Sequence, residues 1–177
     1  MSKIATLGQV LIDEEQLKQR TQELGKQISE DYKGEELLMI GILKGAVIFL
    51  SDLIREITVD TKIDFMAVTS YGASTKSSGV VRILKDLDSG IEDVNVIIVE
   101  DIIDSGITLH YLRDYLMGRK PKSLRICTLL DKPERRDADI TPDYVGFEVE
   151  NKFIVGYGLD CDQKYRNLPY ITCLEGV

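Results

Sequence analysis

The stretch of sequence that decides the fold runs from Val96 to Leu109 and reads VIIVEDIIDSGITL. Its first four residues are apolar and β-branched, which is typical of a strand covered on both faces in a parallel sheet. Glu100 and Asp101 follow at the carboxyl end of that strand, where open α/β sheets bind their ligands. The segment 104–108 then offers a carboxylate, two hydroxyls, a glycine and backbone N–H groups at a helix start. This combination predicts a cradle for a dianionic phosphate.

The sequence excludes two common nucleotide-binding loops. Neither Gly-x-x-x-x-Gly-Lys-Ser/Thr nor Gly-x-Gly-x-x-Gly occurs in the chain, so an ATPase or a dinucleotide-binding protein loses its main support. An ordinary strand–turn–helix, with Asp104 as a helix cap, would explain part of the pattern. It gives no role to the two carboxylates at the strand end. The pattern therefore favours a sugar-phosphate site.

The rest of the chain predicts one α/β domain over residues 1–177, without repeats or linkers. Asp13 and Gln16 resemble a capping box ahead of a helical pattern that runs to Ile28. A strand over 36–43 is expected to break at a turn and to be followed by a helix to Ile54. Further strands are predicted over 63–70, 80–84, 95–99, 123–130, 144–149 and 153–157. Helices between several of these strands imply a parallel core.

Composition narrows the class of protein. At 177 residues and 44% hydrophobic, the chain is long enough to bury a sizeable core. Its net charge of −8 argues against nucleic acid held by a basic face. The three cysteines include no Cys-x-x-Cys, so neither a disulfide framework nor zinc is indicated, and a reducing cytoplasm fits best. No apolar run is long enough for a signal peptide or a membrane span, so no membrane partner is expected.

With its acidic pair, second aspartate, glycine and threonine in register, the segment 96–109 resembles the phosphoribosyl-pyrophosphate (PRPP) motif of the type I phosphoribosyltransferases. It is most similar to the version in the hypoxanthine-guanine branch, and further motifs extend the resemblance over about residues 36–170. The resemblance implies an α/β fold with a central, mainly parallel sheet flanked by helices. It also implies a small hood over the active site, built from the N-terminal segment and about residues 131–177.

The resemblance assigns the ribose 5-phosphate half of the substrate site to the same segment. The residues implied at the 5′-phosphate are Ser105, Gly106, Ile107 and Thr108. Glu100 and Asp101 are expected to orient the ribose hydroxyls and to hold a magnesium ion. Asp104 is the candidate general base, which would take the proton from purine N7.

Two further segments resemble the family's pyrophosphate site and its mobile loop. Lys44 and Gly45 follow a strand and look like the loop that meets the leaving pyrophosphate, and Arg166 matches an arginine with the same role. Ser70 and Tyr71 open a small, polar stretch that resembles a lid over the reacting groups.

The remaining candidates concern the purine. Lys132 aligns with a lysine that donates to the exocyclic oxygen of a 6-oxopurine; an ammonium only donates, so it opposes the amino group of adenine. Phe153 is implied to stack on the base and Ile154 to meet it through the backbone. Asp160 is implied beside them, holding a magnesium ion bound to pyrophosphate. The basic turn at residues 135–136 is expected to be solvated and receives no role.

The activity implied by the resemblance is transfer of the 5-phosphoribosyl group from PRPP to hypoxanthine or guanine, a purine salvage reaction. A xanthine-preferring enzyme remains open, because xanthine differs only at the 2-position of the ring. A regulatory RNA-binding member of the same fold also remains open, although the acidic charge weighs against it. Members of this family commonly form dimers or tetramers, so a homo-oligomer is expected.

Overall fold

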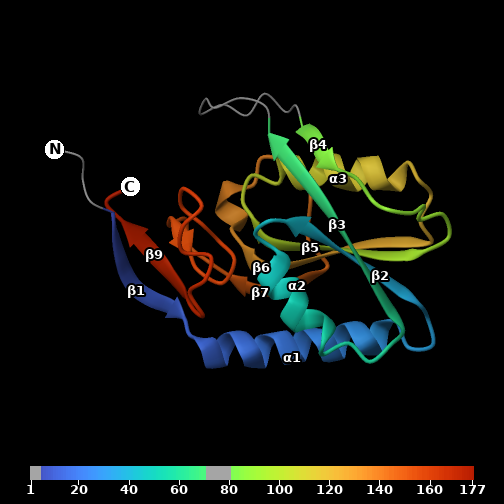
Figure 1. The fold of residues 1–177 in the computed structure, drawn as a ribbon, viewed down its shortest axis with the longest axis horizontal. Coiled ribbons are helices and arrows are strands. Elements are labelled where there is room, and N and C mark those ends of the chain that lie inside the picture. The colour runs from blue at the N-terminus through green and yellow to red at the C-terminus, as the bar shows by residue number, and fades with distance from the viewer. Residues whose placement is uncertain (1–4, 71–80) are drawn as a thin grey trace.

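The computed structural model describes residues 5–70 and 81–177, and these build two sheets and three α-helices (Figure 1). The elements are β1 (Thr6–Ile12), α1 (Glu14–Asp31), β2 (Leu37–Leu43), α2 (Val47–Ile54), β3 (Thr61–Ser70), β4 (Val81–Lys85), β5 (Asn95–Ile103), α3 (Ile107–Met117), β6 (Ser123–Asp131), the 3-10 helix η1 (Pro133–Arg135), β7 (Tyr144–Glu148), β8 (Ile154–Val155) and β9 (Ile171–Glu175). None of the helices in the described ranges combines the length and the apolar character needed to span a membrane.

The main sheet has the order β4-β3-β2-β5-β6-β7, and only its edge strand β4 pairs antiparallel. The central strand β5 alternates between two cores. Val96 and Ile98 pack in a cluster with residues of α3, whereas Ile97 and Val99 pack in a cluster with residues of α1 and α2. Figure 1 accordingly shows α3 on one side of the sheet and α1 and α2 on the other. The sheet is covered on both faces, as its apolar strands predict.

Strand β5 is longer than the sequence predicts. It was expected to end at Val99, but it continues to Ile103, which pairs with Asp131 of β6. Glu100 and Asp101 therefore lie inside the strand near its carboxyl end rather than after it. Pairing with the parallel strand β6 keeps these two residues in an extended conformation, although acidic residues have a low intrinsic preference for strands.

The helix termini follow local sequence signals to different degrees. Before α1, the Gln16 N–H donates to Asp13 Oδ1 over 2.8 Å and the Asp13 N–H donates to Gln16 Oε1 over 2.9 Å, which confirms the capping box. Helix α3 instead begins after Gly106, which has φ 79° and no side-chain cap. The glycine permits this left-handed backbone at the phosphate turn.

The small sheet has the order β1-β9-β8 and is antiparallel. The sequence patterns did not predict its two longer strands, Thr6–Ile12 and Ile171–Glu175. The segment from 131 onward, expected to contribute to the hood, divides between the sheets: β7 adds to the edge of the main sheet, and β8 and β9 belong to the small one.

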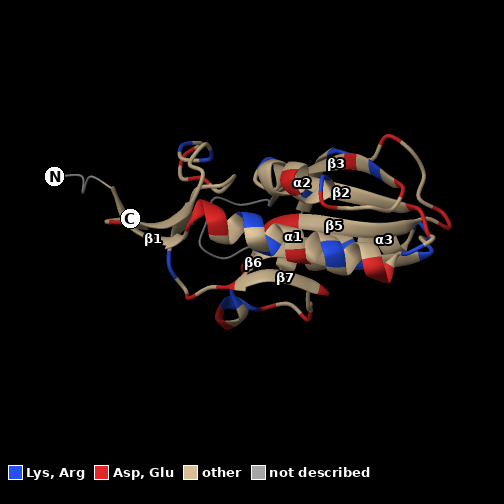
Figure 2. Ribbon diagram, turned by 90° about the horizontal axis from the view of Figure 1, so that it is seen from below, with Lys and Arg blue, Asp and Glu red and all other residues tan. Residues whose placement is uncertain are grey.

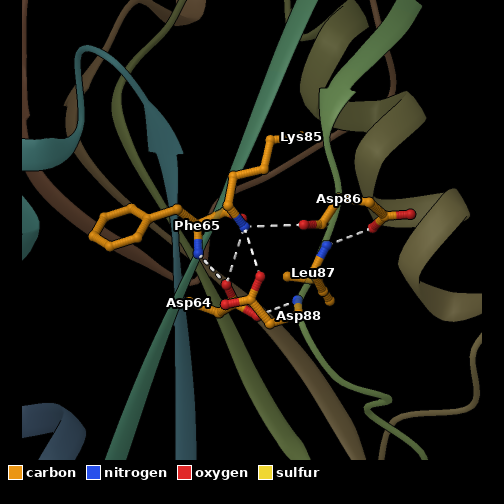
Figure 3. A network of polar contacts seen from close by, with 6 residues as sticks. All are labelled: Asp64, Phe65, Lys85, Asp86, Leu87 and Asp88. Carbon is orange, nitrogen blue, oxygen red and sulfur yellow. Dashed lines mark hydrogen bonds and ion pairs between the residues drawn. The ribbon is translucent and has the colours of Figure 1, made fainter.

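A polar network fixes the base of the β3–β4 hairpin (Figure 3). The Lys85 ammonium donates to the carbonyls of Phe65 and Asp86, each over 3.0 Å, and to Asp88 Oδ1 over 3.2 Å. It also lies 3.5 Å from Oδ1 of Asp64, a carboxylate that is only 11% exposed. One cation thus gathers four oxygens from β3 and from the segment after β4.

The same network reaches α3 through Asp86. Its Oδ2 accepts hydrogen bonds from the Tyr115 hydroxyl, over 2.6 Å, and from Arg119. The Arg119 guanidinium and the Tyr115 hydroxyl lower the pKa of Asp86 to about 2, against the opposing effect of partial burial. The contact links the edge of the sheet to the helix that follows the phosphate turn.

Candidate active site

A cavity of about 230 Å³ lies at the carboxyl end of the central strands. Its lining residues are Asp101, Ile102, Asp104, Lys132, Phe153, Ile154, Leu159 and Asp160. They come from β5 and the residue after it, from the residue after β6 and from the segment around β8, so the main sheet and the small sheet both border the cavity. Six of the eight are residues that the sequence predicted for the site.

The two adjacent carboxyl groups on β5 are held in a poorly solvated position. Burial raises the pKa of Asp101 to about 6, although the Ile102 N–H, which donates to Asp101 Oδ1 over 2.8 Å, opposes the shift. Burial and the neighbouring Asp101 raise the pKa of Glu100 well above its usual range. Because this position disfavours the charged forms, a cation or a hydrogen-bond donor from a ligand would stabilise the two carboxylates.

The predicted magnesium ligands are only partly brought together. Asp101 and Asp160 line the same cavity, whereas Glu100 is not among its lining residues. Within the described ranges, no group of three or more acidic, histidine or cysteine side chains is arranged to hold a metal ion. A metal here would need oxygens from a substrate, which is the usual arrangement for Mg²⁺ at phosphates.

The turn after β2 packs directly against the acidic pair. A Cβ atom on Gly45 would stand 1.9 Å from Asp101 Oδ2, so any other residue would displace the turn or this carboxylate. A Cβ atom on Gly158, whose φ is +99°, would stand 2.2 Å from the Gly45 carbonyl oxygen. In the turn that carries Gly45, the Leu43–Lys44 peptide bond is cis. The predicted pyrophosphate loop and the predicted ribose carboxylate are therefore in contact.

The two predicted pyrophosphate cations converge on one atom. Lys44 Nζ and Arg166 Nη2 each donate to Gln163 Oε1 over 3.2 Å. Arg166 also lies 3.1 Å from Asp160 Oδ1 and donates to the Gly158 carbonyl over 2.7 Å. No sequence pattern singles out Gln163, because it is one polar residue among several in a loop.

The phosphate turn is braced by the segment after η1. The N–H groups of Asp137 and Ala138 donate to the Ser105 carbonyl over 2.9 and 3.1 Å. A Cβ atom on Gly106 would stand 2.6 Å from Ile140 Cγ2, so the turn and this segment are in close contact. The helix starts at Ile107, and its first backbone N–H groups lack intrahelical acceptors. Apart from the Ile107 N–H, which donates to Ser105 Oγ over 3.4 Å, they are available to an anion at the helix N-terminus.

The basic turn is less solvated than expected. Arg135 Nε donates to Asp104 Oδ1 over 3.0 Å in a half-exposed ion pair. The expectation is wrong for Arg136, whose side chain is 16% exposed, pairs with Asp131 and donates to the Ile140 carbonyl over 2.6 Å. A charge run does not reveal such burial, because it depends on carbonyls and a carboxylate from three separate segments.

The purine candidates all line the cavity. Lys132 is buried, and its ammonium donates to the Lys152 carbonyl over 2.6 Å. Burial lowers the pKa of Lys132, and the charge of Asp104 opposes this shift. Phe153 is 48% exposed, while Ile154 is buried and pairs with Cys173 in the small sheet. A half-exposed ring and a lysine lining one cavity suit a flat heterocycle with a carbonyl.

The lid prediction falls mostly outside the described residues. Ser70 is the last residue of β3, and Tyr71 lies in the segment 71–80, which the structure does not describe.

Comparison with known proteins identifies the family. Residues 11–162 match the family model described as the phosphoribosyl transferase domain. The chain belongs to the phosphoribosyltransferase family. The predicted family and the predicted mainly parallel α/β fold are thus both confirmed.

Individual members of the phosphoribosyltransferase family are similar over nearly the whole chain. The hypoxanthine-guanine phosphoribosyltransferase of Mycobacterium tuberculosis (strain CDC 1551 / Oshkosh) is 55% identical, over 94% of this chain and 85% of the relative. That of Bacillus subtilis (strain 168) is 53% identical, over 96% of this chain and 94% of the relative. A crystal structure of a Bacillus anthracis hypoxanthine-guanine phosphoribosyltransferase, with HEPES in its active site, is 54% identical with a TM-score of 0.92. It covers 95% of this chain and 99% of that one.

Proposed function

We propose that this protein transfers the 5-phosphoribosyl group from PRPP to hypoxanthine or guanine, forming IMP or GMP and pyrophosphate. The observation that carries the proposal is the cavity that places Asp101, Asp104 and Lys132 beside Phe153 and Asp160. The chain is more than 50% identical to relatives named for this activity, which supports the proposal. Such a reaction salvages purine bases.

The phosphate turn fixes the sugar. The backbone at residues 105–108, at the start of α3, binds the 5′-phosphate, and the Asp101 carboxylate accepts hydrogen bonds from the ribose hydroxyls. Because Gly45 is packed on Asp101, the pyrophosphate loop begins directly beside the ribose. C1 of the ribose is thereby placed between the leaving group and the base.

The leaving pyrophosphate gains negative charge as the C1–oxygen bond breaks. Lys44 and Arg166 stabilise it, because both are cations that already converge on one point. Asp101 and Asp160 line one cavity and would hold Mg²⁺ together with substrate oxygens, with Glu100 beside them. When bound, the magnesium ion supplies further charge neutralisation on the pyrophosphate.

Other residues that line the cavity recognise the base and remove its proton. Lys132 donates to the 6-oxo group and Phe153 provides a platform for the ring. As the bond from the purine to C1 forms, Asp104 takes the proton that N7 gives up. Its partner Arg135 keeps this carboxylate oriented toward the cavity.

The test is an assay of the purified protein with PRPP, Mg²⁺ and each of hypoxanthine, guanine, xanthine and adenine. Nucleoside monophosphate is expected from hypoxanthine or guanine and not from adenine, and no product from either of the first two would overturn the proposal. A faster reaction with xanthine would favour the xanthine-preferring alternative.

The RNA-binding alternative is disfavoured by charge. Acidic and basic residues are interspersed along α1 (Figure 2), and the chain carries a net charge of −8. Salt-dependent RNA binding without PRPP-dependent turnover would favour it.

We further propose that the protein is cytoplasmic and assembles as a homodimer or a homotetramer. Light scattering should then give a mass of two or four times the 19.9 kDa of one chain. A mass of 19.9 kDa at working concentration would contradict the assembly.

A further inference from the structure

Gln163 stands where two cations meet. Its side-chain oxygen accepts from Lys44 Nζ and from Arg166 Nη2, each over 3.2 Å, although these residues come from distant parts of the chain. A neutral amide oxygen is a weaker acceptor for an ammonium and a guanidinium than a phosphate oxygen is. The point that it occupies therefore suits an anion better than it suits an amide.

The loop that carries Gln163 is held in an uncommon conformation. Asp162, Gln163 and Tyr165 have φ values of 51°, 63° and 75°, which non-glycine residues seldom adopt. The Gln163 N–H donates to Asp160 Oδ2 over 2.8 Å, and Cys161 and Lys164 exchange two backbone hydrogen bonds. The placement of the amide is thus determined by the loop and by the same carboxylate that pairs with Arg166.

We propose that the side-chain carbonyl of Gln163 occupies the position of a pyrophosphate oxygen between Lys44 and Arg166, and so competes with PRPP and pyrophosphate. The inference rests on the proposed function, which gives these two cations their ligand. Gln163 is exposed, so its side chain can leave for solvent without opening the core. In the ligand-free protein it holds the two cations in place, and on product release it replaces the departing oxygen.

The charge at residue 163 should then set the affinity for pyrophosphate. Gln163→Glu supplies a charged oxygen that the two cations hold more strongly, while Gln163→Met keeps the length of the side chain with only a weak acceptor. Lys164→Gln is the matched control. It makes the same change in net charge as Gln163→Glu, on an exposed neighbouring residue, without placing an oxygen between the cations.

The experiment measures calorimetric binding of magnesium pyrophosphate, together with KM for PRPP and for hypoxanthine. For Gln163→Glu we expect the pyrophosphate Kd and the PRPP KM to rise roughly fivefold or more, by less at high salt, with an unchanged hypoxanthine KM. Gln163→Met should bind pyrophosphate at least as tightly as wild type, and Lys164→Gln should stay within about twofold. Thermal midpoints verify that the variants are folded.

Two results would overturn the inference: weaker pyrophosphate binding by Gln163→Met, or equal affinities in wild type, Gln163→Glu and Gln163→Met. Both are read from binding alone and do not need turnover. If the pyrophosphate affinities of wild type and the variants follow the expected order but wild type forms no nucleotide, the inference is supported and the proposed transfer reaction is refuted.

Discussion

At the scale of single residues, the sequence predicts site residues that follow a strand or belong to a short motif. It does not predict residues whose partners are distant in the sequence. Asp101, Asp104 and Lys132 follow apolar runs, so their position at one edge of the sheet could be predicted. Gln163 and Arg136 could not, because their partners lie in segments that only the folded chain brings close.

Asp104 is the residue whose replacement tests the chemistry. Asp104→Asn keeps the shape but cannot accept the N7 proton, so kcat should fall by about 10²–10⁴-fold while PRPP still binds. Steady-state kinetics and PRPP binding by calorimetry measure the two effects. Asp114→Asn, an exposed aspartate on α3, makes the same charge change and should leave kcat as it is. An unimpaired Asp104→Asn enzyme would contradict the assignment.

Lys132 tests recognition of the base. Lys132→Met fills the buried space of the lysine but offers no donor to the 6-oxo group, so KM for hypoxanthine should rise by about tenfold or more. The PRPP KM should change little, because the proposed partner of Lys132 is the base and not PRPP. Competition with adenine reports the selectivity, and a variant that rejects adenine as well as wild type does would show that the base binds elsewhere.

At the scale of elements, the sequence predicted every strand of the main sheet, including its edge strands β4 and β7, but not the two longer strands of the small sheet. β2 and β5 were recognised because both faces are buried. β1 and β9 were not, because they are stabilised by pairing with each other across almost the whole chain, and their own sequences do not alternate. The extension of β5 to Ile103 depends in the same way on its partner β6.

Position 45, in the turn between β2 and α2, is expected to tolerate only glycine. Gly45→Ala places a methyl group 1.9 Å from where Asp101 Oδ2 lies, so the turn or the carboxylate must move. We expect pyrophosphate and PRPP binding to weaken by at least about tenfold, because a displacement of this size disturbs a positioned site. Calorimetry measures the loss. Gly90→Ala is the matched control, since its methyl group would meet nothing within 4 Å, and equal effects of the two substitutions would refute the packing argument.

The network between β4 and α3 should make stability depend on pH. The pKa of Asp86 is lowered from 3.8 to about 2, so its stabilisation is complete above pH 3.8 and is lost as the pH falls through about 2. Asp86→Asn should lower the free energy of unfolding by about 1–2 kcal/mol at neutral pH. That difference should shrink towards pH 2.

Urea denaturation of wild type and variant at a series of pH values measures this difference. Asp88→Asn serves as the control, because its side chain is 79% exposed and a surface ion pair contributes little. If the Asp86→Asn difference stays constant down to pH 2, the charge of Asp86 is not what stabilises the network.

At the scale of the whole molecule, volume alone would point to the wrong place. A concavity of about 720 Å³, lined by residues such as Lys26 and Glu56, is larger than the cavity of about 230 Å³ at the strand ends. The smaller cavity carries three carboxyl groups, the buried lysine and the exposed ring, so chemistry identifies it where size does not. The carboxyl edge of the parallel sheet is also where such folds bind ligands.

A crystal structure of the protein with bound IMP would show whether one site joins the phosphate turn to the cavity lined by Lys132 and Phe153. We expect the 5′-phosphate at the backbone N–H groups of residues 105–108, the 6-oxo group at Lys132 Nζ and the ring against Phe153. IMP bound elsewhere, or bound with its base turned away from Lys132, would refute this joint site.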